Sequence, residues 1–392
     1  MRIALITHSV VRGDGQGRVN YEIARHCLGQ GVDVTLVADR VAPQLLDLGA
    51  CWEPVHPRPG RPNLLKAWSF AARADRVVER LRSEVDVIVA NGFVVRRPHD
   101  VNISNFVHAA WYRSPQHTGR VHGGLYGLYQ RAYTRMNMVW ESAAYGAATT
   151  VVAVSAKLRR DLVSIGVEER RIRVILNGVD TDEFHPGQQD RVALGLPAGV
   201  PIALFAGDIR TPLKNLPGVL QALTQVPGLH LAVCGEARRS PYPQLARQLG
   251  LGDRVHFIGF RRDLPAVMRA CDLLVFPSRC DAFGLVVLEA MASGLPVITA
   301  LSAGASEVVG DDSGFVLQNP DDVPALAAHL RVFSDDADLR RRMGRAARAA
   351  AEQHTWARMA GQYLQLFKRV VAREAACADT AAAGALPAGG SR

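Results

Sequence analysis

Residues 272–294 have the sequence DLLVFPSRCDAFGLVVLEAMASG, and the predicted fold follows from this segment. An apolar run ends at Phe276, a polar loop carries Asp281 and Gly284, and an apolar helical pattern begins near Leu285. Short, continuous apolar runs are typical of strands that are buried on both faces of a parallel sheet. A strand, a loop and a helix in this order predict a βα unit whose ligand lies at the carboxyl end of the strand.

The same alternation extends over most of the 392 residues. In the first half, buried strands are predicted at residues 3–7, 32–38, 85–90, 101–107 and 150–155, with helices such as 19–28 and 63–82 between them. The pattern restarts after the turn-rich residues 177–187, with strands predicted at 202–206, 229–234, 254–258, 272–276 and 296–299. These two series predict an α/β protein with two doubly wound, Rossmann-like domains that face each other across a cleft.

The predicted domains are residues 1–187 and 188–355, with the boundary at the end of the turn-rich segment. An amphipathic helix is predicted over residues 356–372, packing back onto the first domain, because apolar side chains recur at Met359, Tyr363, Phe367 and Val370. Residues 375–392 are rich in alanine and glycine, have little to bury, and are predicted to be disordered.

Composition excludes several classes of protein. With 48% hydrophobic and 21% charged residues, the chain is not a disordered polymer. No apolar run approaches the ~18 residues of a membrane-spanning helix, and the first residues resemble a core strand more than a signal peptide. The six cysteines form no C-x-x-C pair, so neither a zinc site nor a disulfide framework is predicted. We therefore predict a cytoplasmic protein.

The net charge of +9 favours phosphate-bearing ligands or an anionic membrane surface. Nucleic acid is disfavoured as a partner, because no basic run is interleaved with aromatic residues as in a recognisable binding module. Only four residues are lysine, against 42 arginines, so each lysine is of more interest than a single arginine: Lys66, Lys157, Lys214 and Lys368.

Two loops are predicted to contact phosphate. The first is GDGQGR at residues 13–18, where Gly15 and Gly17 let backbone N–H groups approach an anion at a helix start. A dinucleotide-binding loop is the alternative, but the glycine spacing fits it poorly and the second half lacks a hydride-transfer site. The second is FAGDIRTPLKN at residues 205–215, where Arg210 and Lys214 are placed to neutralise a diphosphate; a solvated loop is the alternative.

The third group of candidate residues lies in the opening segment. The first N–H groups of the predicted helix, at Gly284, Leu285 and Val286, are suited to an anion. Glu289, about one turn further on, can accept hydrogen bonds from ribose hydroxyls, and Asp281 can do so for a hexose. One alternative is that Glu289 is only an acid near the helix start, favoured by the helix dipole. Another is that Asp281 and Glu289 are the paired carboxylates of a glycosidase.

These motifs, together with NGVDTDEF at 177–184 and FIGFRRDLPAVMRACDLLVFPS at 257–278, resemble glycosyltransferase family 4 over nearly the whole chain up to Val371. The resemblance implies the GT-B fold and transfer with retention at the anomeric carbon. It also implies a nucleoside-diphosphate sugar as substrate, held mainly by the C-terminal domain, with no metal and no cofactor.

The resemblance also implies roles for single residues. Glu289 holds the ribose, and Asp281 lies near the transferred sugar with Phe283. Backbone N–H groups of Gly284, Leu285 and Val286 contact sugar and phosphate, and the diphosphate is flanked by Arg210, Lys214, Gly15 and Gly17. Phe260 and Arg261 fall where the family contacts the base. The family usually has glutamate where this chain has Asp281, so a weakened enzyme or a non-catalytic nucleotide- or glycan-binding homologue is the alternative.

His108, in NFVHAAW at residues 105–111, occupies a position where several family members carry a histidine that points at the sugar. We include it among the catalytic candidates as a positioning or polarising group, with a purely structural histidine as the alternative. Asp180 and Asp182 form a superficial D-x-D metal motif, which we set aside because the family has its interdomain linker at this position.

Residues 96–135 contain six arginines and six aromatic residues against one acid, Asp100. This composition suits contact with an anionic membrane and a lipid-linked acceptor, or an ordinary arginine-rich solvated face. The predicted function is transfer of a hexose-type sugar from a UDP- or GDP-sugar to a glycan or lipid-linked acceptor. Such a protein would act in cell-surface polysaccharide or glycolipid synthesis, at the inner face of the plasma membrane.

Overall fold

The computed structural model describes residues 1–13, 15–58 and 63–384. By their contacts these form two compact units. Unit 1 comprises Met1–Ile103, Ala143–Val152 and the described part of Ala357–Arg392, and unit 2 comprises Ser104–Ser142 and Ala153–Trp356. Within the described ranges, no helix combines the length and the apolar character needed to cross a membrane.

The first half of the chain forms a seven-stranded sheet with the order β5-β3-β1-β6-β7-β8-β9. The pairs of β1 with β3 and β6, of β3 with β5, and of β6 with β7 are parallel. The strands are β1 (Arg2–Ile6), β3 (Asp33–Ala38), β5 (Cys51–Pro54), β6 (Val87–Asn91), β7 (His99–Ser104), β8 (Ala148–Ala153) and β9 (Ile172–Val174). A separate two-stranded sheet pairs β2 (Ser9–Val10) with β4 (Arg40–Val41).

The second half forms a six-stranded sheet with the order β12-β11-β10-β13-β14-β15, and every neighbouring pair is parallel. The strands are β10 (Ile202–Ala206), β11 (His230–Cys234), β12 (Val255–Gly259), β13 (Leu273–Phe276), β14 (Val297–Ala300) and β15 (Gly314–Leu317). The sequence predicted the first five and missed β15. Numbered within this half, the strand order is 3-2-1-4-5-6. Successive strands are added to one side of β10 up to β12 and to its other side from β13 onward. The reversal of strand order between β10 and β13 is where such sheets bind ligands.

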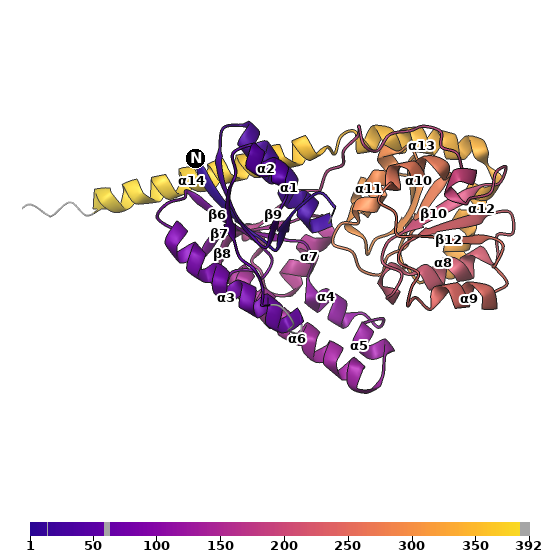
Figure 1. The fold of residues 1–392 in the computed structure, drawn as a ribbon, viewed down its shortest axis with the longest axis horizontal. Helices are drawn as coiled ribbons and strands as arrows, with labels where there is room; N and C mark the ends of the chain where they lie inside the picture. The colour runs from indigo at the N-terminus through magenta and orange to yellow at the C-terminus, as the bar shows by residue number, and fades with distance from the viewer. Residues whose placement is uncertain (14, 59–62, 385–392) are drawn as a thin grey trace, which may run out of the picture. The chain divides into compact units, whose positions relative to one another are not determined.

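Figure 1 shows the helices, most of which lie between successive strands. In the first half they are α1 (Gly15–Gly29), α2 (Pro43–Asp47), α3 (Asn63–Leu81), α4 (His108–Arg113), α5 (Thr118–Val121), α6 (Gly124–Ala147) and α7 (Ala156–Ser164). In the second half they are α8 (Leu216–Leu223), α9 (Tyr242–Gln248), α10 (Leu264–Ala270), α11 (Leu285–Ala292), α12 (Val323–Asp335), α13 (Ala337–Ala351) and α14 (Trp356–Gly384). Helices α4 to α6, and likewise α12 to α14, follow one another without an intervening strand. Short 3-10 turns include η3 (Pro212–Lys214) and η4 (Gly304–Val308).

The second sheet is apolar on both faces, which explains its continuous hydrophobic strands. On one face, Phe205, Val233 and Val275 belong to a core that α8, α9 and α12 complete. The alternate residues of β10 and β13, such as Leu204 and Leu274, point to the other face and are equally buried. Because both faces are covered, the strands show no polar alternation, and the sequence pattern correctly predicts a parallel sheet.

Helix α14 is longer than predicted. Its apolar stripe of Met359, Tyr363, Phe367 and Val370 is buried, as the spacing indicates. The helix does not end near residue 372, however, and residues 375–384, predicted to be disordered, continue it to Gly384. Alanine has the highest helix propensity, which favours the extension of an existing helix through an alanine-rich segment. The remainder of the predicted tail, residues 385–392, lies outside the described residues.

The free energy of unfolding should fall as the pH drops below about 6.5, because several partly or fully buried histidines resist protonation. Burial is the largest cause that lowers the pKa of each from 6.5: His99, His230, His256 and His329. The unfolded chain therefore binds more protons than the folded chain in this range. Stability is fully present above the unfolded pKa and is lost as the pH falls through the folded values. Urea unfolding at about pH 7.5, 6.5 and 5.5 measures this dependence.

His230 and His256 allow a sharper test, since their rings stack with centroids 5.4 Å apart on neighbouring strands. Replacing both with glutamine should reduce the slope of stability against pH. An unchanged slope would show that these two histidines do not contribute to it.

Candidate functional site

The loops that follow the neighbouring strands β10 and β11 lie against each other. The loop after β10 begins with Gly207, which has φ of 155° and whose added Cβ would lie 3.4 Å from the Lys214 side chain. The loop after β11 begins with Gly235, where an added Cβ would lie 2.4 Å from the Gly207 carbonyl oxygen. The loops therefore approach backbone to backbone, and only glycine fits at Gly235 without moving its neighbour.

Lys214 and Asp281 form an ion pair at this edge of the sheet. Lys214 lies at the end of η3, and its amine is also 5.3 Å from the centroid of the Phe276 ring. Both charged side chains are mostly buried, with exposed fractions of 19% and 17%. The sequence assigned Lys214 to the diphosphate and Asp281 to the sugar, but it did not predict that the two side chains pair with each other.

The Asp281 loop is fixed by the loop that follows β14. The Asp281 N–H donates to the Ser302 carbonyl at 3.0 Å, and its carbonyl accepts from the Gly304 N–H at 3.2 Å. Its Oδ1 accepts from the backbone N–H of Phe283 at 3.3 Å. One carboxylate oxygen thus orients the loop while the other meets Lys214. This arrangement holds the Asp281 carboxylate in one place.

Gly284 makes the sharp entry into α11. Its φ of 91° is left-handed, and an added Cβ would lie 3.2 Å from the Phe276 ring. As the N-cap residue it offers no side chain to the first N–H groups of the helix, at Leu285 and Val286. These donors and the helix dipole favour an anion at this end of α11. Glu289 lies partly buried about one turn further along the same helix.

Arg210 pairs with a residue that the sequence analysis missed. Its guanidinium donates to both carboxylate oxygens of Asp208, at 2.9 and 3.1 Å. The hydrogen bond from Arg210 is the largest cause that lowers the pKa of Asp208. The Arg210 side chain remains 55% exposed. Its charge therefore stays at the mouth of the site while its geometry is set by Asp208.

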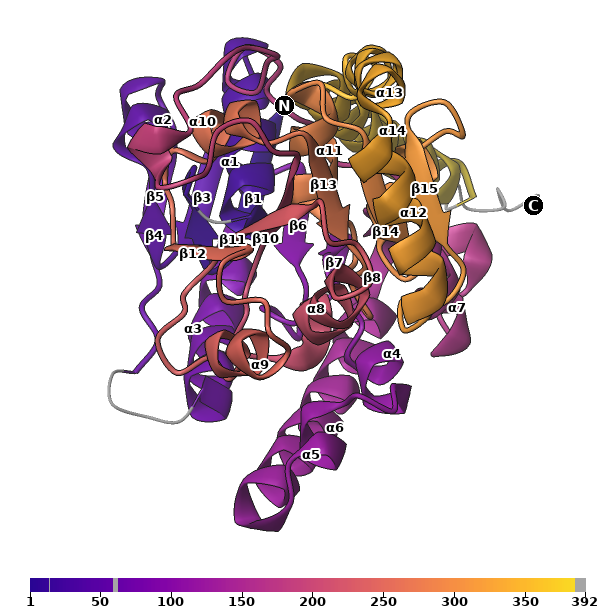
Figure 2. The ribbon, with the colours of Figure 1, turned by 90° about the vertical axis from the view of Figure 1, so that its right-hand side faces the viewer.

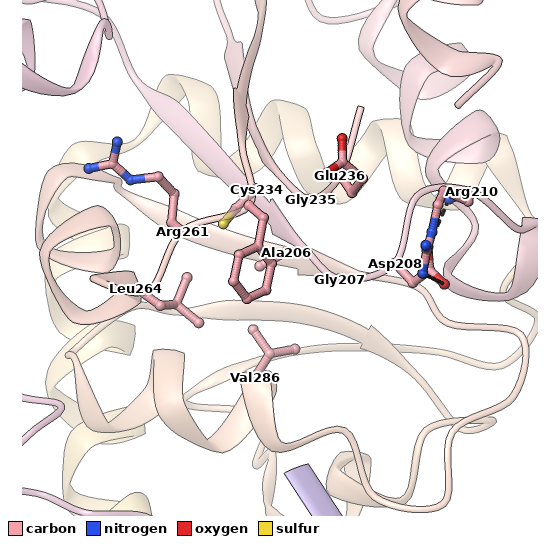
Figure 3. A pocket seen from close by; sticks show the side chains of 11 residues that line it. Ala206, Gly207, Asp208, Arg210, Cys234, Gly235, Glu236, Arg261, Leu264 and Val286 are labelled. Carbon is pink, nitrogen blue, oxygen red and sulfur yellow. Dashed lines mark hydrogen bonds and ion pairs between the residues drawn. The ribbon is translucent and has the colours of Figure 1, made fainter. Parts of the chain in front are cut away.

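A cavity of about 330 Å³ opens beside this pair, within the size range of small-molecule sites. Figure 3 shows Arg261 and Leu264 at one end and the Asp208–Arg210 pair at the other, with Val286 on a further side. The lining includes the predicted base-contacting residues and several that were not predicted: Ala206, Gly207, Asp208, Arg210, Cys234, Gly235, Glu236, Phe260, Arg261, Leu264 and Val286. Phe260 is 71% exposed, which is unusual for a large apolar ring.

His108 opens helix α4 and is oriented by Glu141 of α6. Its Nδ1 lies 2.6 Å from one carboxylate oxygen of Glu141, and its backbone N–H donates to the other at 2.8 Å. Glu141 is only 4% exposed. The carboxylate favours the proton on Nδ1, so Nε2 carries the lone pair of the neutral ring. Glu141 is 33 residues away in the chain, and nothing local in the sequence indicates the pairing.

Lys157 is a second lysine near Asp281 that the sequence analysis did not place in the site. Its amine lies 2.8 Å from Asp161 and 3.8 Å from the sulfur of Cys280. Burial favours the neutral amine, but Cys280 and Asp161 outweigh it, and the pKa of Lys157 is raised. Two of the four lysines of the chain thus lie at the 280–281 loop.

The glycines of the first loop lie in unit 1. Gly15 is exposed at the start of α1, and Gly17 is buried. A Cβ on Gly17 would lie 3.0 Å from the Val11 carbonyl oxygen and 3.1 Å from Ser9 Oγ, so packing alone favours glycine there. Their contact with phosphate stays a prediction.

The Asp180–Asp182 motif forms a turn. Asp180 Oδ1 accepts from the N–H groups of Asp182 and Glu183, at 3.2 and 3.1 Å. Across the described ranges, no group of three or more His, Cys, Asp and Glu side chains is placed to hold a metal ion.

Two family models match the chain, glycosyl transferases group 1 over residues 187–350 and glycosyltransferase family 4 over residues 13–183. A D-inositol 3-phosphate glycosyltransferase of Xylanimonas cellulosilytica is 34% identical over 256 residues. The match covers 61% of each chain, so this protein spans less than two thirds of that relative's length.

Two solved structures share the fold. A sucrose-phosphate synthase of Thermosynechococcus elongatus has a TM-score of 0.77 at 20% identity, covering 95% of this chain and 99% of that one. HepE of Anabaena, in complex with UDP and glucose, has a TM-score of 0.70 at 23% identity, covering 94% and 100%. With the two matched models on successive halves of the chain, the protein belongs to glycosyltransferase family 4 and has the GT-B fold.

Proposed function

We propose that the protein is a retaining glycosyltransferase that moves a hexose-type sugar from a UDP- or GDP-sugar to a hydroxyl of a glycan or lipid-linked acceptor. It would require neither a metal nor a cofactor, and would act at the inner face of the plasma membrane in polysaccharide or glycolipid synthesis. The observation that carries the proposal is the convergence of the cavity, Lys214 and the start of α11 at the reversal between β10 and β13. The UDP in HepE supports a UDP-sugar.

The donor would be held along this edge of unit 2. The base would enter the cavity at Phe260 and Arg261, which offer an exposed ring and a guanidinium. Glu289 would accept from the ribose hydroxyls, and the diphosphate would lie at the start of α11. Arg210 and Lys214 would supply positive charge where the leaving diphosphate gains negative charge, and such charge stabilisation is the largest single contribution in many enzymes.

The chemical step needs no protein nucleophile. The bond between the anomeric carbon and the diphosphate oxygen breaks, and its electron pair goes to the leaving phosphate. The acceptor hydroxyl forms the new bond on the same face and gives its proton to that phosphate. His108, held by Glu141, would position or polarise a sugar hydroxyl through Nε2.

A non-catalytic homologue that binds a nucleotide or glycan is the second candidate. The observation that favours it is the pairing of Asp281 with both Lys214 and the Phe283 N–H. Each carboxylate oxygen thus already accepts one hydrogen bond, which leaves fewer acceptor positions for the hydroxyls of a sugar.

A screen of UDP-, GDP-, ADP- and dTDP-sugars without added metal should show nucleotide release from a UDP- or GDP-sugar. Glu289→Ala should lower release about 100-fold, since the ribose hydroxyls lose a charged acceptor. Glu84→Ala, at an exposed position outside the site, is the control and should match wild type. Nucleotide binding without release, even with glycolipid acceptors present, would contradict the transferase proposal and support the binding homologue.

Lys214→Met should weaken UDP binding and lower turnover about 100-fold, because the diphosphate loses a nearby cation. Lys214→Arg should recover much of both. UDP lacks the transferred sugar, so Asp281→Asn should reduce turnover while leaving UDP affinity little changed by calorimetry. If Asp281→Asn weakened UDP binding as much as Lys214→Met, the lysine would act only by holding the aspartate.

His108→Ala should lower kcat about 10- to 100-fold with little change in the donor KM. Glu141→Gln should cost less, because its amide oxygen can still accept from Nδ1. The double variant should be no slower than His108→Ala, since Glu141 acts through the histidine. Additive losses, or a loss that follows a lowered melting temperature, would instead indicate a structural role for the pair.

A further inference from the structure

Among the described residues, the hairpin of α5 and α6 carries a larger number of exposed large apolar side chains than any other element. Residues 121–129, VHGGLYGLY, contain no charged side chain. We call five of these residues the apolar tip, and their exposed fractions are 48% for Val121, 87% for Leu125, 55% for Tyr126, 66% for Leu128 and 45% for Tyr129. Apolar side chains gathered on one exposed element mark a surface that binds a partner or a membrane.

The hairpin is a well-defined structure rather than a loose loop. Figures 1 and 2 both show α5 and α6 side by side. A Cβ on Gly119 of α5 would lie 2.8 Å from the Gly127 carbonyl oxygen of α6, so the two helices approach closely at a pair of glycines. Arg131 Nε donates to the Gly119 carbonyl at 2.7 Å, and His117 Nε2 lies 2.9 Å from Thr134 Oγ1. These contacts fix the backbone and hold the tip side chains in solvent.

The chain segment that carries the tip has only positive charges. Residues 101–140 contain no aspartate or glutamate but four arginines, which are all exposed: Arg113, Arg120, Arg131 and Arg135. Arg120 and Arg135 lie 5.9 and 5.4 Å from the centroid of the Tyr112 ring. Cation–π contacts of this kind hold the two guanidinium groups against Tyr112 while their N–H groups remain suited to phosphate.

We propose that the apolar tip inserts into the surface of an anionic lipid bilayer, with the arginines at the level of the lipid phosphates. An uncharged apolar tip bordered by arginines matches hydrocarbon below phosphate, whereas a protein partner would have to supply acids in the same arrangement. The biological role of this membrane binding rests on the proposed lipid-linked acceptor. A protein bound to the bilayer would meet such an acceptor at the bilayer surface. The binding itself depends only on the hairpin.

Co-sedimentation with vesicles tests the inference directly. The full chain should pellet with vesicles of phosphatidylcholine containing about 30% phosphatidylglycerol, and about 10-fold less with phosphatidylcholine alone. Leu125→Ser with Leu128→Ser should abolish pelleting. Val163→Ser with Val192→Ser, which alters side chains 43% and 71% exposed elsewhere in unit 2, is the matched control and should bind as wild type. All four sites are exposed, so circular dichroism and melting temperature should be unchanged.

Arg120→Gln with Arg135→Gln tests the charge separately, and should weaken binding and flatten its dependence on salt. The inference is overturned if wild type fails to pellet with the anionic vesicles, or if the tip variant pellets normally. It is equally overturned if the tip variant changes the oligomeric state and not vesicle binding, since the tip would then be an interface between two copies. Nucleotide release with a soluble acceptor is measured in parallel. If the transferase proposal is wrong, wild type releases no nucleotide but still pellets with vesicles. If the membrane inference is wrong, wild type releases nucleotide but does not pellet.

Discussion

The candidate site depends on one constraint of the parallel sheet, which is that β10 and β13 are neighbours whose following loops run in opposite directions. Parallel strands end at the same edge, so the two loops start side by side and then diverge, leaving a crevice. The Lys214–Asp281 pair joins the two loops across this crevice. Residues that contribute to the site from either loop are therefore positioned by the strand order before any ligand is present.

Close backbone packing makes this edge rigid. Gly235 lies against the Gly207 carbonyl, and Gly284 brings α11 against the Phe276 ring. Side chains at these positions would push the loops apart and misplace the charged groups. The polar residues are held in the same way, since Asp208 orients Arg210, and Glu141 orients His108. Arg210 and His108 are thus each fixed by a second residue before a ligand binds. Less side-chain conformational entropy is then lost on binding.

The two proposed activities use opposite kinds of surface. The donor site combines a concave cavity with paired, partly buried charges. The apolar tip is uncharged and exposed, and exposed arginines flank it in the sequence. A soluble nucleotide needs enclosure and compensating charge, whereas a bilayer needs an outward apolar surface with cations beside it. Their presence on one chain agrees with an enzyme whose donor is soluble and whose acceptor is lipid-linked.

The sequence by itself determined the two α/β halves, the strands β10 to β14, and the start of a helix after Gly284, because continuous apolar strands and glycine turns are local signals. It also identified Arg210, Lys214, Asp281 and Glu289 as candidates from their residue types. Only the tertiary structure decided how they pair. Lys214 and Asp281 are 67 residues apart, and His108 and Glu141 are 33 apart. Neither contact can therefore be predicted from the spacing of residues within one helix or strand. Side-chain partners across loops are set by strand order and backbone approach, which are properties of the folded chain as a whole.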